Sequence, residues 1–185
     1  MNIPRLAVAI LLATTTVPAG ATEHNIEGKF NHAGKDVIIY RVGEVYAETG
    51  NTDQFAVAVA PTIREYTAKT GFEACANICK NGNRMGARIL TIESAAACPQ
   101  TDICPEGMTP TGTDIHSHAF SDYTPNTTDT LFLAGDYSKR RKKVRTFPEA
   151  FSPADYETGP GYLVTATTLR HQKGKNLVRD ITIKR

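Results

Sequence analysis

The 185-residue sequence has no apolar run long enough to cross a membrane and little net charge. Leu6 to Ala13 is an apolar run, but it is far shorter than the roughly 20 residues of a membrane-spanning helix. The formal net charge is only +2, so general binding to nucleic acid is not indicated. No internal repeat is visible, and the length suits one domain around a single core.

The first 21 residues have the layout of a secretory signal peptide. Arg5 precedes the apolar run, and Ala19-Gly20-Ala21 has the A-x-A pattern of a cleavage site. A buried N-terminal helix is the alternative interpretation. The sequence therefore predicts a single mature domain of residues 22–185, or 185 − 21 = 164 residues, that works in the periplasm or is secreted.

Four cysteines remain after export: Cys75, Cys79, Cys98 and Cys104. An even set in an oxidising compartment predicts disulfides. On one strand, Cys75 and Cys79 would lie about 13 Å apart, which is too far for a shared bond. Either each pairs with Cys98 or Cys104, or those two pair with each other, and the sequence leaves this open. A four-thiolate zinc site is disfavoured because the spacing fits the common pairs poorly.

Strands and helices are expected to alternate loosely after a polar stretch without regular structure at residues 22–35. The predicted strands are 36–48 (or a short hairpin there), 72–79, 85–93, 113–118, 161–170 and 176–184. Asn81-Gly82 is a strong hairpin signal between two of them. The predicted fold is therefore α/β, with a mixed β-sheet flanked by helices.

Two helices are predicted from their end signals. The first begins at a cap on Thr52 or Asp53 and ends at Gly71, and Pro61 would kink or split it. The second begins in the stretch FSPADY, with Ser152 as the cap and proline at the first helical position.

The stretch Asp114–His118, DIHSH, contains a candidate metal site. Side chains alternate along a strand, so His116 and His118 would point to the same face. Two imidazoles suit a cation such as zinc, and a third protein ligand would leave the fourth position open for catalysis. On its own, a His-x-His pair more often consists of ordinary surface residues.

Two further elements give the pair a context. Asp155 lies one helical turn after Ser152, so the two would share a face; the plain alternative is that they only cap a helix. Glu73 lies within an otherwise apolar predicted strand, where an unpaired carboxylate is costly to bury. It would share a face with Cys75, unless it sits on an edge strand and faces water.

Together, the Glu-Ala-Cys stretch at residue 73, the His-Ser-His stretch and Ser152-x-x-Asp155 resemble the JAMM motif of the MPN/JAB metalloproteases. The small residue Ala76 is similar to the glycine that prokaryotic members usually carry there. The resemblance covers about residues 72–165, most of the mature chain. The combined order and spacing is more specific than any one of the three pieces.

The resemblance implies a role for each matched residue. His116, His118 and Asp155 would bind one Zn2+ per chain. Glu73 would hold the attacking water and act as general base, and Ser152 would hydrogen-bond the developing oxyanion. The implied reaction is hydrolysis of peptide or isopeptide bonds, on a fold like that of cytidine deaminases. Glu93 is a competing general base, because it ends the partner strand of the hairpin.

The chain departs from the family in one respect: residues 119–151, 33 in all, separate His118 from Ser152, where the family has a short gap. An insertion at 119–150 adds little closure entropy, so it can serve as a lid or a substrate-selecting arm. It carries KRRKKVR, Lys139–Arg145, with six cations in seven residues. This run is either a solvated loop or a grip on an anionic partner.

The sequence therefore predicts an exported zinc-dependent metallopeptidase. Its substrate would be a peptide, a protein or peptidoglycan of the cell envelope, and neither nucleic acid nor a transmembrane segment is expected. The alternative is a non-catalytic JAB-like binding module of the envelope that holds a partner through the basic insertion.

Overall fold

The computed structural model describes residues 25–99, 101–133 and 142–181. The predicted signal peptide, residues 1–21, lies outside the described residues, as does part of the basic run, residues 139–141. Among the described residues, no helix is both long enough and apolar enough to span a bilayer.

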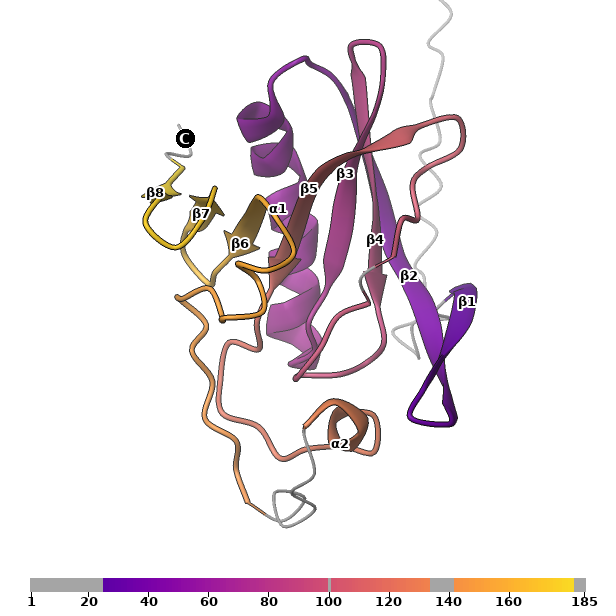
Figure 1. Cartoon of the computed structure of the whole chain (residues 1–185), viewed down its shortest axis with the longest axis vertical. Helices are drawn as coiled ribbons and strands as arrows, with labels where there is room; N and C mark the ends of the chain where they lie inside the picture. The colour runs from indigo at the N-terminus through magenta and orange to yellow at the C-terminus, as the bar shows by residue number, and fades with distance from the viewer. Residues whose placement is uncertain (1–24, 100, 134–141, 182–185) are drawn as a thin grey trace, which may run out of the picture.

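The described residues form an α/β structure around one mixed eight-stranded sheet (Figure 1). The strand order is β1-β2-β4-β3-β5-β6-β7-β8. β5 and β6 run parallel, and the other neighbouring pairs run antiparallel. The strands are β1 Asn25–His32, β2 Lys35–Glu48, β3 Cys75–Asn81, β4 Arg84–Thr91, β5 Thr109–Ser117, β6 Gly161–Val164, β7 Leu169–Gln172 and β8 Val178–Asp180. The mixed sheet was predicted correctly.

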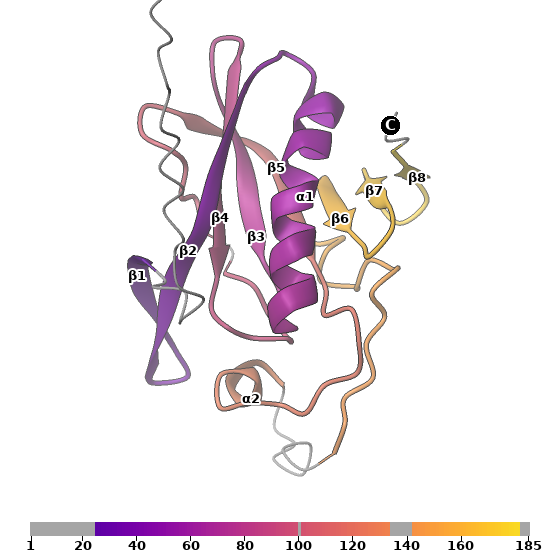
Figure 2. The same ribbon diagram turned by 180° about the vertical axis from the view of Figure 1, so that it is seen from behind.

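The long helix α1, Thr52–Thr70, covers one face of this sheet (Figure 2). Asn51 caps it, accepting a hydrogen bond from the backbone N–H of Gln54 at 3.1 Å, so the predicted cap at Thr52 or Asp53 was wrong by one or two residues. Gly71 ends the helix as predicted, with φ at 77°. Pro61 is exposed and does not split the helix, which continues through it from Thr52 to Thr70. The described residues place no comparable helix on the other face.

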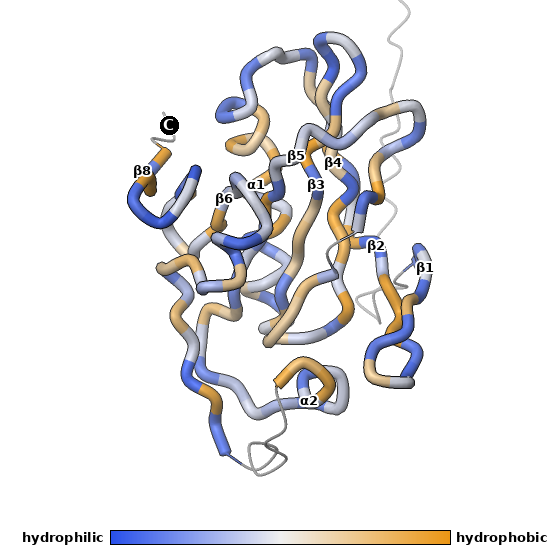
Figure 3. The backbone as a smooth tube through the Cα atoms, viewed as in Figure 1, coloured by the Kyte–Doolittle hydropathy of each residue, from blue (hydrophilic) through white to orange (hydrophobic). Residues whose placement is uncertain are grey.

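The core lies between α1 and the central strands. Buried apolar side chains of the helix, such as Phe55 and Ile63, pack against Ala74, Ala76 and Ile78 next to and along β3. Figure 3 shows apolar residues gathered along the central strands and hydrophilic residues at the hairpin turns. The period-two alternation predicted for this segment is therefore correct, because the even-numbered positions face the helix and leave Cys75 on the opposite face.

The hairpin around Gly82 forms as predicted, with φ at 58° at that glycine. Its first strand begins at Cys75 rather than at residue 72, so Glu73 lies just before β3. At the N-terminus, residues 25–32 form β1 instead of a loose stretch, because Glu27 pairs with Arg41 on the neighbouring strand β2 and with Arg88 on β4, the next strand of the sheet. β2 is one strand whose register shifts between Arg41 and Gly43.

The C-terminal region differs from the two predicted strands. Residues 161–170 are divided into β6 and the start of β7, because the hydroxyl of Thr165 accepts hydrogen bonds from the backbone N–H groups of Thr167 and Thr168 and closes a turn. The last strand, β8, occupies only Val178–Asp180 of the predicted strand 176–184. Residues 182–184 of that predicted strand lie outside the described residues.

Two disulfides resolve the open cysteine pairing. Cys75 bonds to Cys98 and Cys79 bonds to Cys104, with Cα–Cα distances of 6.0 and 5.9 Å. Both bonds fasten the loop after β4 to the sheet face opposite α1. They are compatible with a periplasmic or extracellular protein.

Candidate metal centre

The end of β5 presents the two predicted histidines on one face. His116 lies on β5 directly opposite Cys75 of β3, and His118 follows the last residue of the strand. Ser117, between them, points the other way, and its Oγ lies 2.7 Å from the Oγ1 of Thr67 on α1. This alternation leaves both imidazoles on the sheet face that the helix does not cover.

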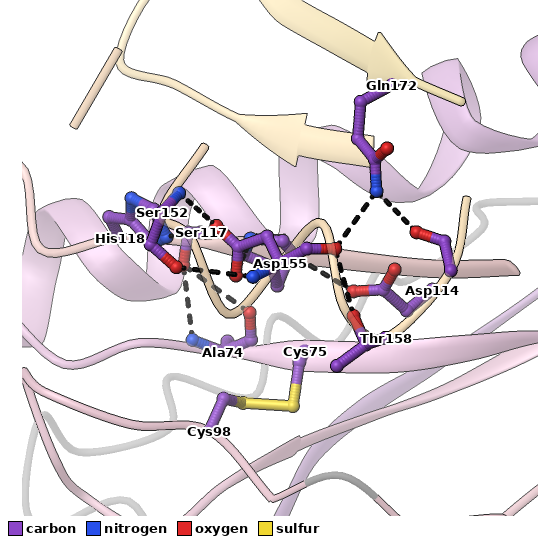
Figure 4. A network of polar contacts seen from close by, with 12 residues as sticks. Ala74, Cys75, Cys98, Asp114, Ser117, His118, Ser152, Asp155, Thr158 and Gln172 are labelled. Atoms are coloured by element: carbon purple, nitrogen blue, oxygen red, sulfur yellow. Dashed lines mark hydrogen bonds and ion pairs between the residues drawn. A yellow bond between two sulfur atoms is a disulfide. The ribbon is translucent and has the colours of Figure 1, made fainter. Parts of the chain in front are cut away.

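Asp155 meets the histidines from a distant part of the sequence. Its Oδ1 lies 3.5 Å from the Nε2 of His116, and its Oδ2 lies 3.3 Å from the Nε2 of His118. One ligand atom from each residue falls within 4.8 Å of the others, so the three residues could hold a single metal ion. The structure therefore brings together the three residues predicted as ligands, despite the insertion between them. Figure 4 shows two of them, His118 and Asp155.

The donors suit a metal ion in both chemistry and bonding. Two imidazole nitrogens and one carboxylate oxygen form a ligand set that zinc uses in catalytic sites. His116 is only 7% exposed, and its Nε2 is buried without a hydrogen-bond partner. The 3.5 Å separation from Asp155 is an ion-pair distance, too long for a good hydrogen bond. A cation would satisfy this nitrogen.

The charges of the cluster also favour a cation. Burial opposes ionisation of Asp155, but its contacts with His116 and His118 outweigh this and lower the carboxyl pKa well below its usual range. Burial disfavours a charged His116, yet the hydrogen bond with Asp114 and the negative charges of Asp114 and Asp155 raise the imidazole pKa. The two carboxylates thus draw positive charge to the site, which a bound metal ion can supply in place of protons.

Asp155 is held by a tight turn and not by the predicted helix. The backbone N–H of Ser152 donates to Oδ2 of Asp155 at 2.5 Å, and the N–H of Asp155 donates to Oγ of Ser152 at 3.3 Å. This is the reciprocal bonding of a helix start. The helix does not continue, because the buried amide of Gln172 on β7 donates to the carbonyl of Asp155 (Figure 4). The same amide donates to the carbonyl of Gly159, whose φ is 109°.

Glu73 faces the same space from the other side. Its backbone is fixed by Ser94 and Thr91, through hydrogen bonds of 2.8 Å each. Its side chain is half-buried and lines the pocket. Burial raises the carboxyl pKa to about 8; the positive charge of His116 opposes this rise, and the negative charge of Asp155 adds to it. Glu93, the competing base, is absent from the pocket lining and lies near Tyr66 of α1.

A pocket of about 910 Å³ surrounds these groups. Glu73, Ser152 and the three candidate ligands all line it. One wall is the loop of residues 95–99, which the Cys75–Cys98 disulfide ties to β3, and the other comes from residues of the insertion such as Tyr123 and Phe147. Phe151 packs edge-on against His116, with ring centroids 6.2 Å apart, and shields it from water.

The insertion is anchored beside the pocket. It contains the short helix α2, Asp129–Phe132, and Tyr123 pairs with Val144 across its two arms. The buried carboxylate of Asp129 accepts hydrogen bonds from the Oγ of Ser94 and the N–H of Ala95, each at 2.7 Å. These contacts fasten the region around α2 to the pocket-lining loop, and the described residues of the insertion contribute a wall of the pocket.

Two residues at this site were not predicted from the sequence. Asp114 bonds to the Nδ1 of His116 at 2.8 Å, and its position two residues earlier on the same strand face is a signal that could have indicated it. Gln172 holds the turn around Asp155, and nothing in its local sequence indicates that role.

Comparisons with known proteins add no relative. No family model matches the chain, and searches of curated proteins and of solved structures returned no significant match. The resemblance to the JAMM motif therefore depends on the residues and their geometry alone.

Proposed function

We propose that this chain is an exported zinc-dependent peptidase of the JAMM type, on a domain related to the cytidine-deaminase fold. The observation that carries the proposal is the meeting of His116, His118 and Asp155 around a buried nitrogen without a hydrogen-bond partner, in a pocket that also contains Glu73. Separate segments of the chain contribute these groups, so local sequence bias does not account for their meeting.

The chain's own groups suit the hydrolysis of an amide. A zinc ion on the three ligands would supply Lewis-acid polarisation of the scissile carbonyl and would acidify a water. Glu73, in its partly desolvated position, would accept a proton from the attacking water and pass it to the leaving amine. In its contact with the N–H of Asp155, the Oγ of Ser152 is the acceptor, which leaves its hydroxyl hydrogen to stabilise an oxyanion.

The proposed substrate is a peptide or isopeptide bond in peptidoglycan or in an envelope protein. The two disulfides support this proposal, because they are compatible with a working form in an oxidising compartment. The pocket of about 910 Å³ is large enough for a peptide segment with side chains on both sides of the cleaved bond.

The test compares zinc content and peptide hydrolysis in four oxidised proteins: wild type, His116→Ala, Glu73→Gln and His32→Ala. His32, on β1 and away from the pocket lining, is the matched control. We expect one zinc per chain in wild type and control, loss of zinc in His116→Ala, and retained zinc without turnover in Glu73→Gln. A binding module would instead retain zinc in Glu73→Gln and show no hydrolysis in any protein, and a wild type free of zinc would refute the proposal.

A further inference from the structure

Asp114 makes a contact that controls how His116 is presented. The Oδ2 of Asp114 lies 2.8 Å from the Nδ1 of His116, within ordinary hydrogen-bond distance. Both residues are on β5 and are separated by one residue, so their side chains share a face of the sheet. The contact is therefore built into the strand and needs no movement of a loop.

This contact determines which nitrogen is left for a metal ion. A neutral imidazole carries one N–H donor and one nitrogen lone pair. With Nδ1 donating to Asp114, the lone pair is on Nε2, which is the buried nitrogen without a hydrogen-bond partner near Asp155. Such carboxylate–histidine pairs orient metal ligands and increase their basicity.

The neighbouring strand contains a space that fits the Asp114 carboxylate. Gly161 of β6 is the partner of Asp114 in the parallel pair. A Cβ atom at residue 161 would lie 2.1 Å from Oδ1 and 3.1 Å from Cγ of Asp114. The φ angle of Gly161 lies outside the left-handed region, so the backbone does not require glycine there. The requirement comes from the space that the carboxylate occupies.

We propose that Asp114 is a positioning residue for the metal centre and that Gly161 supplies the space it needs. Asp114 fixes the tautomer and orientation of His116, so that Nε2 points at the ion shared with His118 and Asp155. The inference rests on the proposed zinc function and extends it beyond the residues of the recognised motif. The alternative hypothesis is that Asp114 only stabilises the pairing of β5 with β6 and has no effect on the metal site.

The test measures two properties of each variant: the Kd for Zn2+, by competition with a chromophoric chelator, and the free energy of unfolding of the metal-free protein. The variants are Asp114→Ala, Asp114→Asn and Gly161→Ala. The matched control is Gly28→Ala on β1, where an added Cβ meets nothing within 4 Å. The visible spectrum of the Co2+ form reports the geometry at the ligands independently of catalysis.

We expect Asp114→Ala and Gly161→Ala to weaken zinc binding by about 10- to 100-fold. They should also alter the Co2+ spectrum. Asp114→Asn should lie between them and wild type, because its amide oxygen still accepts from Nδ1–H but carries no charge. Gly28→Ala should bind zinc like wild type. A merely structural role would lower the free energy of unfolding and leave the Kd unchanged.

Two outcomes would overturn the inference and separate it from the proposed function. If wild type binds zinc and both Asp114→Ala and Gly161→Ala bind it equally well, the positioning role is wrong and the zinc site stands. If wild type itself takes up no zinc, the proposed function fails, and the role of Asp114 fails with it.

Discussion

Replacing Glu73 by glutamine should make the metal-free protein less sensitive to rising pH. The pKa of this carboxyl is raised from 4.5 to about 8 in the folded protein, mainly because burial disfavours its charged form. The folded state therefore binds the proton more tightly than the unfolded chain does. Stability is unaffected below the unfolded pKa and falls as pH rises between the two values. The variant Glu73→Gln has no carboxyl to ionise and should not show this loss.

The size of the effect follows from the two pKa values. Each pH unit between them costs about 1.4 kcal/mol of unfolding free energy. The cost for Glu73 is then about 1 kcal/mol at pH 5 and about 4 kcal/mol at pH 7.5. Wild type should therefore lose about 3 kcal/mol more than Glu73→Gln between these two conditions. Contributions from other titrating groups, including His116, are common to both proteins and largely cancel in this difference.

The assay is guanidinium unfolding with a chelator present, followed by circular dichroism because the chain has no tryptophan. The variant should be markedly more stable than wild type at pH 7.5 and close to it at pH 5. Added zinc should narrow the difference at pH 7.5, because a nearby cation favours the charged carboxylate. Equal losses for the two proteins between pH 5 and pH 7.5 would show that Glu73 is not desolvated and would refute the reasoning.

Three further perturbations test the supports of the pocket. Replacing both Cys75 and Cys98 by serine should lower the free energy of unfolding by about 3 kcal/mol, as expected for a bond that closes a loop of 23 residues; a melting temperature equal to that of wild type would contradict this. Asp129→Ala leaves three backbone and hydroxyl donors unpaired, so protease cleavage within residues 119–150 should become markedly faster at constant protease concentration. Gln172→Ala removes the hydrogen bond to the turn that carries Asp155, so both the zinc affinity and the unfolding midpoint of the metal-free protein should fall. An unchanged zinc affinity would show that the turn keeps its conformation without Gln172.

The pattern of polar and apolar residues was sufficient to predict the centre of the sheet. Alternation along residues 72–79 placed Ala74 and Ala76 on the helix side and Cys75 on the other, as observed. The two ends of α1 were predicted within two residues, because capping acts over a few bonds. The spacing of His116 and His118 predicted their shared face for the same local reason.

Features that depend on distant segments were missed. The stretch FSPADY carries helix-start signals, yet the amide of Gln172 binds the carbonyl of Asp155 and that of Gly159 just beyond the stretch, and the chain turns instead. β1 forms because Glu27 finds arginines on other strands. The space at Gly161 is visible only when β5 and β6 are side by side. Each is a tertiary contact, which local propensity does not encode.

Both disulfides attach one loop to the same strand, β3, on either side of Asn77. Reductants break such attachments, so the pocket needs oxidation to complete its wall opposite the insertion. A copy of the chain with reduced cysteines would keep the same side chains at the end of β5, but the loop of residues 95–99 would no longer be tied to β3. If the chain is exported as proposed, the oxidation that follows transport would be the step that completes the pocket.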